Sequence, residues 1–164
     1  MKNWAIIVAI GENNEIGKDN DLLWRISADM KRFKSITTGH TLVMGRKTFD
    51  SLPKGALPNR RNVVLSHQNK ELENVEFYPS VPSLIENIDQ KEQVFVIGGA
   101  SLYQAFIDKV DVMYITKVHA SFSADVFFPD FDWEDWEVFY EEFLPKGDRD
   151  EFPHTFYQLK RKKN

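Results

Sequence analysis

The chain has 164 residues, a formal net charge of −4 and no cysteine. The length favours one domain, residues 1–164, and the absence of cysteine excludes disulfides, thiolate catalysis and cysteine-ligated metals. The acidic balance argues against broad nucleic-acid binding. The longest apolar run, WAIIVAIG, is far shorter than a membrane span, and no small-residue cleavage site follows it. We therefore expect a cytoplasmic globular protein that binds neither membranes nor nucleic acid.

Short apolar runs rich in β-branched residues predict buried strands at residues 4–10, 40–45, 62–66, 94–99 and 112–118. Helix-like segments alternate with them at residues 27–36, 46–52, 83–88 and 101–108. This alternation predicts an α/β domain with a mixed, mainly parallel central sheet. Residues 136–143 and 155–161 alternate in period two, which predicts an antiparallel C-terminal hairpin added to the edge of the sheet.

The first predicted helix carries an acid, Asp29, within its apolar stripe. At about 100° per residue, the stripe is formed by Ile26, Met30, Phe33 and Ile36. An acid in the first turn, just after a Ser27 N-cap, is favoured by the helix dipole whatever the protein does. The alternative is a carboxylate that lines a pocket and binds a ligand. The local sequence favours the first interpretation, so the decision depends on the rest of the chain.

Two strand-to-helix junctions place glycine directly after the strand. The first contains Gly45, Arg46, Lys47 and Thr48, and the second contains Gly98, Gly99, Ala100, Ser101 and Leu102. Helix N-termini expose unpaired N–H groups, and glycine lets a phosphate approach the backbone closely. Neither junction matches the dinucleotide fingerprint or the P-loop, so each glycine can instead simply ease a tight turn. An arginine at a helix start can bind a phosphate monoester with two hydrogen bonds, which makes Arg46 the stronger indication.

Other chemistries have little support in the sequence. The four histidines lack metal-ligand spacing, and neither H-E-x-x-H nor G-x-S-x-G is present. We therefore expect no metal site. The segment Ser66, His67 and Gln68 ends a predicted strand with hydrogen-bond donors and is a third candidate for phosphate contact.

Six stretches, taken in the order in which they occur along the chain, resemble the dihydrofolate reductase family. Together they extend over essentially the whole chain. They are AIIVAIGENNEIGKDNDLLWRISADMKRFK, VMGRKTFDSLP, LPNRRNVVLS, VFVIGGASLYQAF, DVMYITKV and FPDF. The resemblance implies reduction of 7,8-dihydrofolate to tetrahydrofolate by hydride transfer from NADPH. It also implies a sheet of about eight strands with about four flanking helices, and a monomer.

The resemblance identifies Asp29 as the acid of the pterin pocket, where its carboxylate would accept two hydrogen bonds from the substrate. Burial would raise its pKa, and the proton for pterin N5 would come from water. The implied catalytic set is Asp29, Leu22, Trp24 and Thr116. The implied substrate-binding residues are Ile7, Val8, Ala9, Asp29, Met30, Phe33, Leu57, Arg60, Ile97 and Thr116. Among them, Arg60 would pair with the α-carboxylate of the substrate's glutamate.

On the cofactor side, the resemblance implies that Arg46, Ser66 and His67 bind the 2′-phosphate of NADPH. The implied cofactor-binding residues are Ala9, Ile16, Gly17, Gly45, Arg46, Lys47, Thr48, Leu65, Ser66, His67, Gly98, Gly99, Ala100, Ser101, Leu102 and Tyr103. The family's bond between Gly98 and Gly99 is cis. Two departures stand out, because Leu23 occupies a position where many members have proline and Ala100 replaces a frequent third glycine.

Two alternatives remain open at this stage. A pyrimidine reductase of riboflavin synthesis shares this fold and NADPH, although Asp29 after Trp24, and Arg60 after Leu57 and Pro58, argue against it. A non-catalytic nucleotide-binding module would use the two glycine junctions without turnover. Oxidation of NADPH that depends on dihydrofolate distinguishes the main prediction from both.

Overall fold

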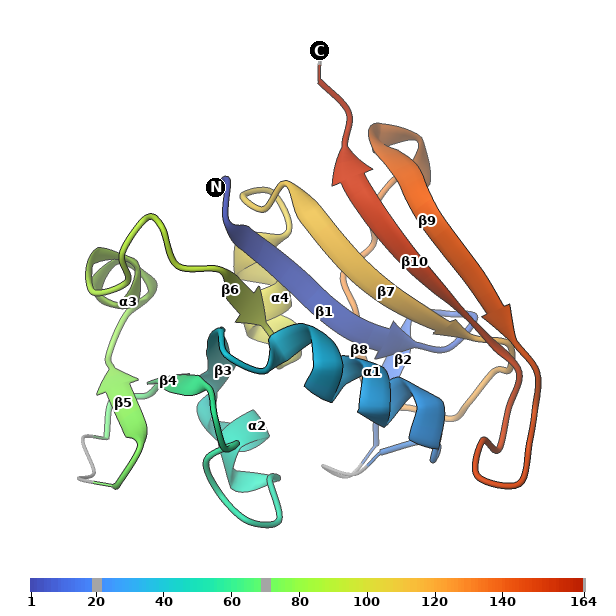
Figure 1. The fold of residues 1–164 in the computed structure, drawn as a ribbon, viewed down its shortest axis with the longest axis horizontal. Helices are drawn as coiled ribbons and strands as arrows, with labels where there is room; N and C mark the ends of the chain where they lie inside the picture. Colours follow the sequence, from blue (N-terminus) through green and yellow to red (C-terminus); the bar gives the residue numbers. More distant parts are fainter. Residues whose placement is uncertain (19–21, 69–71, 164) are drawn as a thin grey trace.

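The computed structural model describes residues 1–18, 22–68 and 72–163. Eight of the strands in this part of the chain form one sheet in the order β5-β4-β3-β6-β1-β7-β10-β9 (Figure 1). Its strands are β1 (Trp4–Ile10), β3 (Thr41–Gly45), β4 (Arg61–Leu65), β5 (Val75–Tyr78), β6 (Val94–Val96), β7 (Val112–Val118), β9 (Trp136–Leu144) and β10 (His154–Arg161). The helices are α1 (Ser27–Thr37), α2 (Arg46–Asp50), α3 (Val81–Glu86) and α4 (Ala100–Phe106), with a 3₁₀ turn at Trp133–Asp135.

Six neighbouring strands, from β5 to β7, run parallel, whereas β10 lies antiparallel between β7 and β9. Parallel neighbours need crossover connections, and the helices lie on these connections. The predicted mixed sheet with an antiparallel C-terminal hairpin and four helices is therefore confirmed. The hairpin places β9 at the edge, as its period-two pattern indicates.

The central strands are apolar on both faces because helices cover both faces. Along β1, the side chains of Ile6 and Val8 enter one buried cluster, and that of Ile7 enters the other. Residues of α3 and α4 pack into the first cluster, and residues of α1 and α2 into the second. In Figure 1, α1 accordingly crosses in front of the sheet and α4 lies behind it. Each large apolar side chain buried in these layers contributes about 1.5–3 kcal/mol.

Element boundaries differ from the predictions by a few residues. The strand predicted at 94–99 ends at Val96, because the two glycines form a turn. The helix predicted at 83–88 begins at Val81, where Ser80 provides the capping box. The second sheet, which pairs β2 (Glu15–Gly17) with β8 (Val126–Phe127), and strand β5 were not predicted. Strands of two to four residues carry too few side chains for a recognisable period.

The prediction that Ser27 caps α1 was wrong. Ile26 occupies the N-cap position, and its side chain makes no capping hydrogen bond. The Asp150 carboxylate instead accepts a hydrogen bond from the Ala28 N–H at 3.0 Å, and the Arg149 carbonyl accepts one from the Ser27 N–H. The loop between β9 and β10 thus satisfies the exposed donors of α1.

Among the described residues, no helix is long and apolar enough to cross a membrane. The same residues contain no group of three or more histidine, aspartate or glutamate side chains that could hold a metal ion.

Candidate active site

Asp29 lies in the first turn of α1, where the helix meets β7. The buried hydroxyl of Thr116 donates a hydrogen bond to Asp29 Oδ1. Burial raises the pKa of Asp29 above its usual value, and the hydrogen bond from Thr116 and the nearby charges of His154 and Arg32 act in the opposite direction. The two interpretations of Asp29 are therefore compatible, because a first-turn acid can also be a partly desolvated group at a pocket.

Apolar side chains line the α1 side of the sheet. Phe33, Leu57 and Ile97 are partly buried against the same cluster as Ile7. The side chain of Val8 points to the opposite face, into the cluster shared with α4, so only its backbone lies on the α1 side.

The segment before α1 combines one buried aromatic residue with exposed apolar ones. Trp24 is 7% exposed and packs on Phe122 with ring centroids 5.1 Å apart, and Ala9 contacts the same cluster. Met30 is 64% exposed and Leu22 is 69% exposed. Met30 thus presents a large apolar side chain to solvent directly after Asp29 on α1.

The sequence did not indicate how Leu57 is held. Asn62, which is 1% exposed at the start of β4, accepts a hydrogen bond from the Leu57 N–H and donates one to the Leu57 carbonyl, both at 2.9 Å. This pair of bonds fixes the backbone of the loop that presents Leu57. An asparagine at the start of a predicted apolar strand was the available signal, but its partner could not be read from the sequence.

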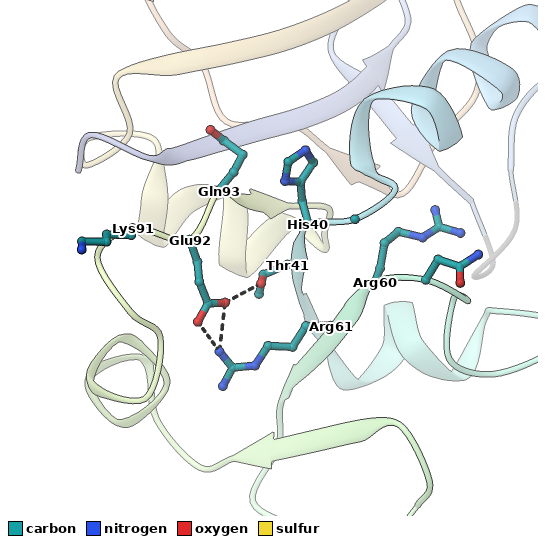
Figure 2. A pocket seen from close by; sticks show the side chains of 9 residues that line it. His40, Thr41, Arg60, Arg61, Lys91, Glu92 and Gln93 are labelled. Carbon is teal, nitrogen blue, oxygen red and sulfur yellow. Dashed lines mark hydrogen bonds and ion pairs between the residues drawn. The ribbon is translucent and has the colours of Figure 1, made fainter.

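Two consecutive arginines have different partners (Figure 2). Arg61 forms ion pairs with Glu76 at 2.6 Å and Glu92 at 2.7 Å, and these hydrogen bonds raise its pKa. Arg60 points the other way and donates to the Pro58 carbonyl at 2.9 Å and the Thr37 hydroxyl at 3.1 Å. Within the described residues Arg60 has no carboxylate partner, and burial lowers its pKa. Of the two arginines, Arg60 is therefore the one whose charge is not neutralised by a carboxylate of the described residues.

A cavity of about 630 Å³ opens beside these arginines, at the amino ends of β3, β4 and β6. Figure 2 shows Glu92 inside it, bonded to the Thr41 hydroxyl and to Arg61. The charged groups of this cavity are therefore largely matched to one another. It lies at the opposite end of these strands from the glycine junctions.

The two glycine junctions meet in space. The Gly45 N–H donates to the Gly98 carbonyl at 2.8 Å, and the bond between Gly98 and Gly99 is cis, as the family resemblance implies. Gly98 has φ +135°, and a Cβ built on it would lie 3.1 Å from the Thr48 hydroxyl. The glycines thus keep the backbone accessible at the point where α2 and α4 begin.

The predicted 2′-phosphate residues also lie together. Arg46 donates to the Gln68 side chain at 3.4 Å and to Asp50 at 2.9 Å. Gln68 in turn donates its N–H to the Ser66 hydroxyl at 3.1 Å, and His67 is exposed. The start of α2 and the end of β4 therefore present Arg46 and a short polar segment side by side.

Other predicted cofactor residues differ in exposure. Lys47 and Ser101 are exposed, and Ile16, Gly17, Leu65, Thr48, Gly99 and Ala100 are half-buried. Leu102 belongs to the core, as does Tyr103, whose hydroxyl donates to the Ile7 carbonyl at 3.1 Å and whose pKa is raised by burial. The side chains of Leu102 and Tyr103 thus pack in the core beneath the turn formed by Gly98 and Gly99. Only their backbone lies near the start of α4.

Comparisons with known proteins agree with this geometry. Residues 3–161 match the family described as dihydrofolate reductase. A dihydrofolate reductase of Staphylococcus aureus is 44% identical over 159 residues, which cover 97% of this chain and 98% of the relative. One from Haemophilus influenzae is 36% identical and covers 97% of this chain and 99% of its own. A solved dihydrofolate reductase from Enterococcus faecalis, complexed with NADP(H), has a TM-score of 0.88 at 34% identity and covers 98% of this chain and 96% of its own.

The fold and the comparisons define an NADP-dependent oxidoreductase that acts on a small substrate. The chain belongs to the dihydrofolate reductase family. It catalyses the NADPH-dependent reduction of 7,8-dihydrofolate to 5,6,7,8-tetrahydrofolate. The family match sets aside the pyrimidine reductase of riboflavin synthesis and the non-catalytic module.

Proposed function

We propose that Asp29 is the group that binds and polarises the pterin ring of dihydrofolate. The observation that carries this proposal is a partly desolvated carboxylate that accepts a hydrogen bond from the Thr116 hydroxyl, on the helix whose Phe33 packs against the apolar cluster of Ile7. The hydrogen bond from Thr116 uses one lone pair of Oδ1, so the carboxylate keeps acceptor positions for the ring N–H and the amino group. Asp29 orients the ring, and water supplies the proton for N5.

The residues around Asp29 take the rest of the substrate. Phe33 and Met30 follow Asp29 on α1 and contact the rings of dihydrofolate from one side. Leu57 packs on the aminobenzoyl group of the substrate. Arg60 binds the glutamate α-carboxylate, because its guanidinium is partly desolvated and has no carboxylate partner within the described residues. The remaining substrate contacts are Ile7, Val8, Ala9, Ile97 and Thr116. Trp24 and Leu22 border the reacting end.

The glycine junctions fit the cofactor NADPH, which supplies the hydride when bound. Side chains at Gly98 or Gly45 would fill the space next to Thr48 and Gly99, where a diphosphate has to approach the backbone. Arg46, with Ser66 and His67 beside it, binds the 2′-phosphate. Lys47 and Ser101 are exposed at the two helix starts and contribute donors to the phosphates. Ala9, Ile16 and Gly17 contact the nicotinamide end.

We also propose that residues 1–164 act as a single, cytoplasmic, monomeric domain without nucleic-acid partners. The family match over residues 3–161 and the single main sheet support one domain. The net charge of −4 disfavours nucleic-acid binding. Sedimentation of the purified protein checks the monomer, and a dimer would contradict it.

The test of the reaction is a spectrophotometric assay of NADPH oxidation in the presence of dihydrofolate, repeated with NADH. We expect oxidation that depends on dihydrofolate and is faster with NADPH at equal cofactor concentration. Absence of dihydrofolate-dependent oxidation would overturn the functional assignment. Equal rates with NADH would overturn the role of Arg46 alone.

A further inference from the structure

Two buried nitrogen atoms close to Asp29 have no hydrogen-bond partner within the described residues. They are Nη1 of Arg32, on α1, and Nε2 of His154, the first residue of β10. His154 is 0% exposed. Buried donors and acceptors without partners are rare in folded proteins, so two of them around one carboxylate call for an explanation.

Arg32 packs against β10, the strand that pairs with β7 and its Thr116. It follows Asp29 by three residues, and therefore lies on the same side of α1. Its Nη2 forms an ion pair with Glu142 of β9, and its Cζ lies 4.2 Å from the centre of the Phe156 ring. Phe156 is the register partner of Thr116, which donates to Asp29. These contacts hold a positive charge behind Asp29.

His154 faces the same side of the sheet. It lies two residues before Phe156 on β10 and is the register partner of Val118, two residues after Thr116. Side chains two apart on a strand share a face, so the imidazole lies on the Asp29 side. Its Nδ1 is 3.2 Å from the Phe152 carbonyl, which fixes the ring and leaves Nε2 unpaired.

The other charged groups on the packed elements are either already paired or point away from Asp29. Asp150 acts on the pKa of Asp29 in the opposite direction to Arg32 and His154, and its carboxylate is bonded to the Ala28 N–H. Glu142 offsets part of the charge of Arg32. The remaining charged side chains on α1, β7, β9, β10 and the flanking loops are exposed or directed elsewhere: Arg25, Lys31, Lys34, Lys117, Glu137, Glu141, Lys146, Asp148, Arg149, Glu151, Lys160 and Arg161. His119 contacts the Thr155 hydroxyl, on the opposite face of β10 from His154.

We propose that Arg32 and His154 are positioning residues that keep Asp29 charged despite its burial and thereby set the pH range of turnover. This inference rests on the role proposed above for Asp29. The reaction takes up a proton, so the rate falls as pH rises through the site's apparent proton affinity. Removing a nearby positive charge raises that affinity, whether the proton resides on Asp29 or on the substrate. The falling limb of the rate profile then moves to higher pH.

The test uses Arg32→Gln and His154→Gln, with the pre-steady-state rate of NADPH oxidation measured between pH 5 and 9. We expect each variant to move the midpoint upward by on the order of half a pH unit or more. Arg32→Lys keeps the charge and should restore most of the parent profile. Lys34→Gln removes a charge from the exposed face of the same helix and should leave the midpoint unchanged.

Parent-like midpoints in folded Arg32→Gln and His154→Gln would overturn the inference. If Arg32→Gln does not fold, His154→Gln decides alone, and an unshifted midpoint overturns the inference. An equal shift in Lys34→Gln would show a general charge effect and also overturn it. Asp29→Asn, measured in parallel, separates the two proposals, because its loss of turnover together with unshifted Arg32 and His154 profiles would leave the role of Asp29 intact.

Discussion

Charged residues are used differently around Asp29 and around Arg61. In the network of Arg61, Glu76 and Glu92, the guanidinium of Arg61 bonds two carboxylates and the Asn87 carbonyl. Around Asp29, one hydroxyl donates to the carboxylate, and two buried nitrogens lack partners within the described residues. Matched charges tie strands and loops together, whereas incompletely matched ones retain capacity for a ligand. We therefore propose that local stability and function depend on different charged groups.

The largest expected effect follows from Asp29→Asn. The amide can still accept the hydrogen bond from Thr116 but cannot provide a negative charge to the pterin. We expect turnover with dihydrofolate to fall by roughly 10²-fold or more, the scale of a positioned acid–base group, while the protein stays folded. Steady-state kinetics with circular dichroism check this. Full activity at neutral pH would reduce Asp29 to a helix-start acid.

The paired arginines provide the next test. Arg60→Leu should raise KM for dihydrofolate by about ten- to a hundredfold, because a charged hydrogen bond contributes about 1.5–3 kcal/mol. Arg61→Leu should leave KM unchanged and lower the free energy of unfolding by about 1–2 kcal/mol, because its ion pairs are partly solvent-screened. Kinetics and urea unfolding of both variants check the contrast. Interchanged outcomes would assign the substrate carboxylate to Arg61.

Arg46 is an intermediate case, since it is partly matched by Asp50 at 2.9 Å. We expect Arg46→Ala to raise KM for NADPH about tenfold or more while KM for NADH changes little, because only NADPH carries the 2′-phosphate. Asp50→Asn is the matched control and should not weaken NADPH. Equal losses for both cofactors would show that Arg46 does not read the 2′-phosphate.

Local patterns predicted the elements that are long and buried, whereas contacts across the chain had to come from the structure. The run at 4–10 is continuously apolar, and the stripe of α1 has enough residues to reveal its period. The cap that Asp150 provides to α1, the bonds of Asn62 to Leu57 and the hydroxyl of Tyr103 on β1 depend on partners that no local pattern identifies. For Asp29 itself, local sequence favoured a helix-start acid, and the two glycine junctions, Arg60 and the ordered family motifs favoured the pocket.

The smallest expected effect concerns the stability of the folded protein, and it tests the comparison without any substrate. We expect Asp29 and Glu76 to make stability depend on pH in opposite directions. The pKa of Asp29 is raised in the folded state, so the folded protein binds this proton more tightly than the unfolded chain does. Stability from this group is greatest below the unfolded pKa, near 3.8, and declines as pH rises through the folded pKa. Asp29→Asn should therefore raise the Tm slightly at neutral pH and not at low pH.

Glu76 provides the opposite sign, because its hydrogen bond with Arg61 lowers its pKa. Its contribution is present above the unfolded pKa, near 4.5, and is lost as pH falls through the folded pKa. Glu76→Gln should lower stability at neutral pH by about 0.5–1 kcal/mol, the range for a partly exposed ion pair, and have less effect at low pH. Thermal unfolding of both variants across pH measures the difference, and shifts of the same sign would show that the two carboxylates are held in the same way.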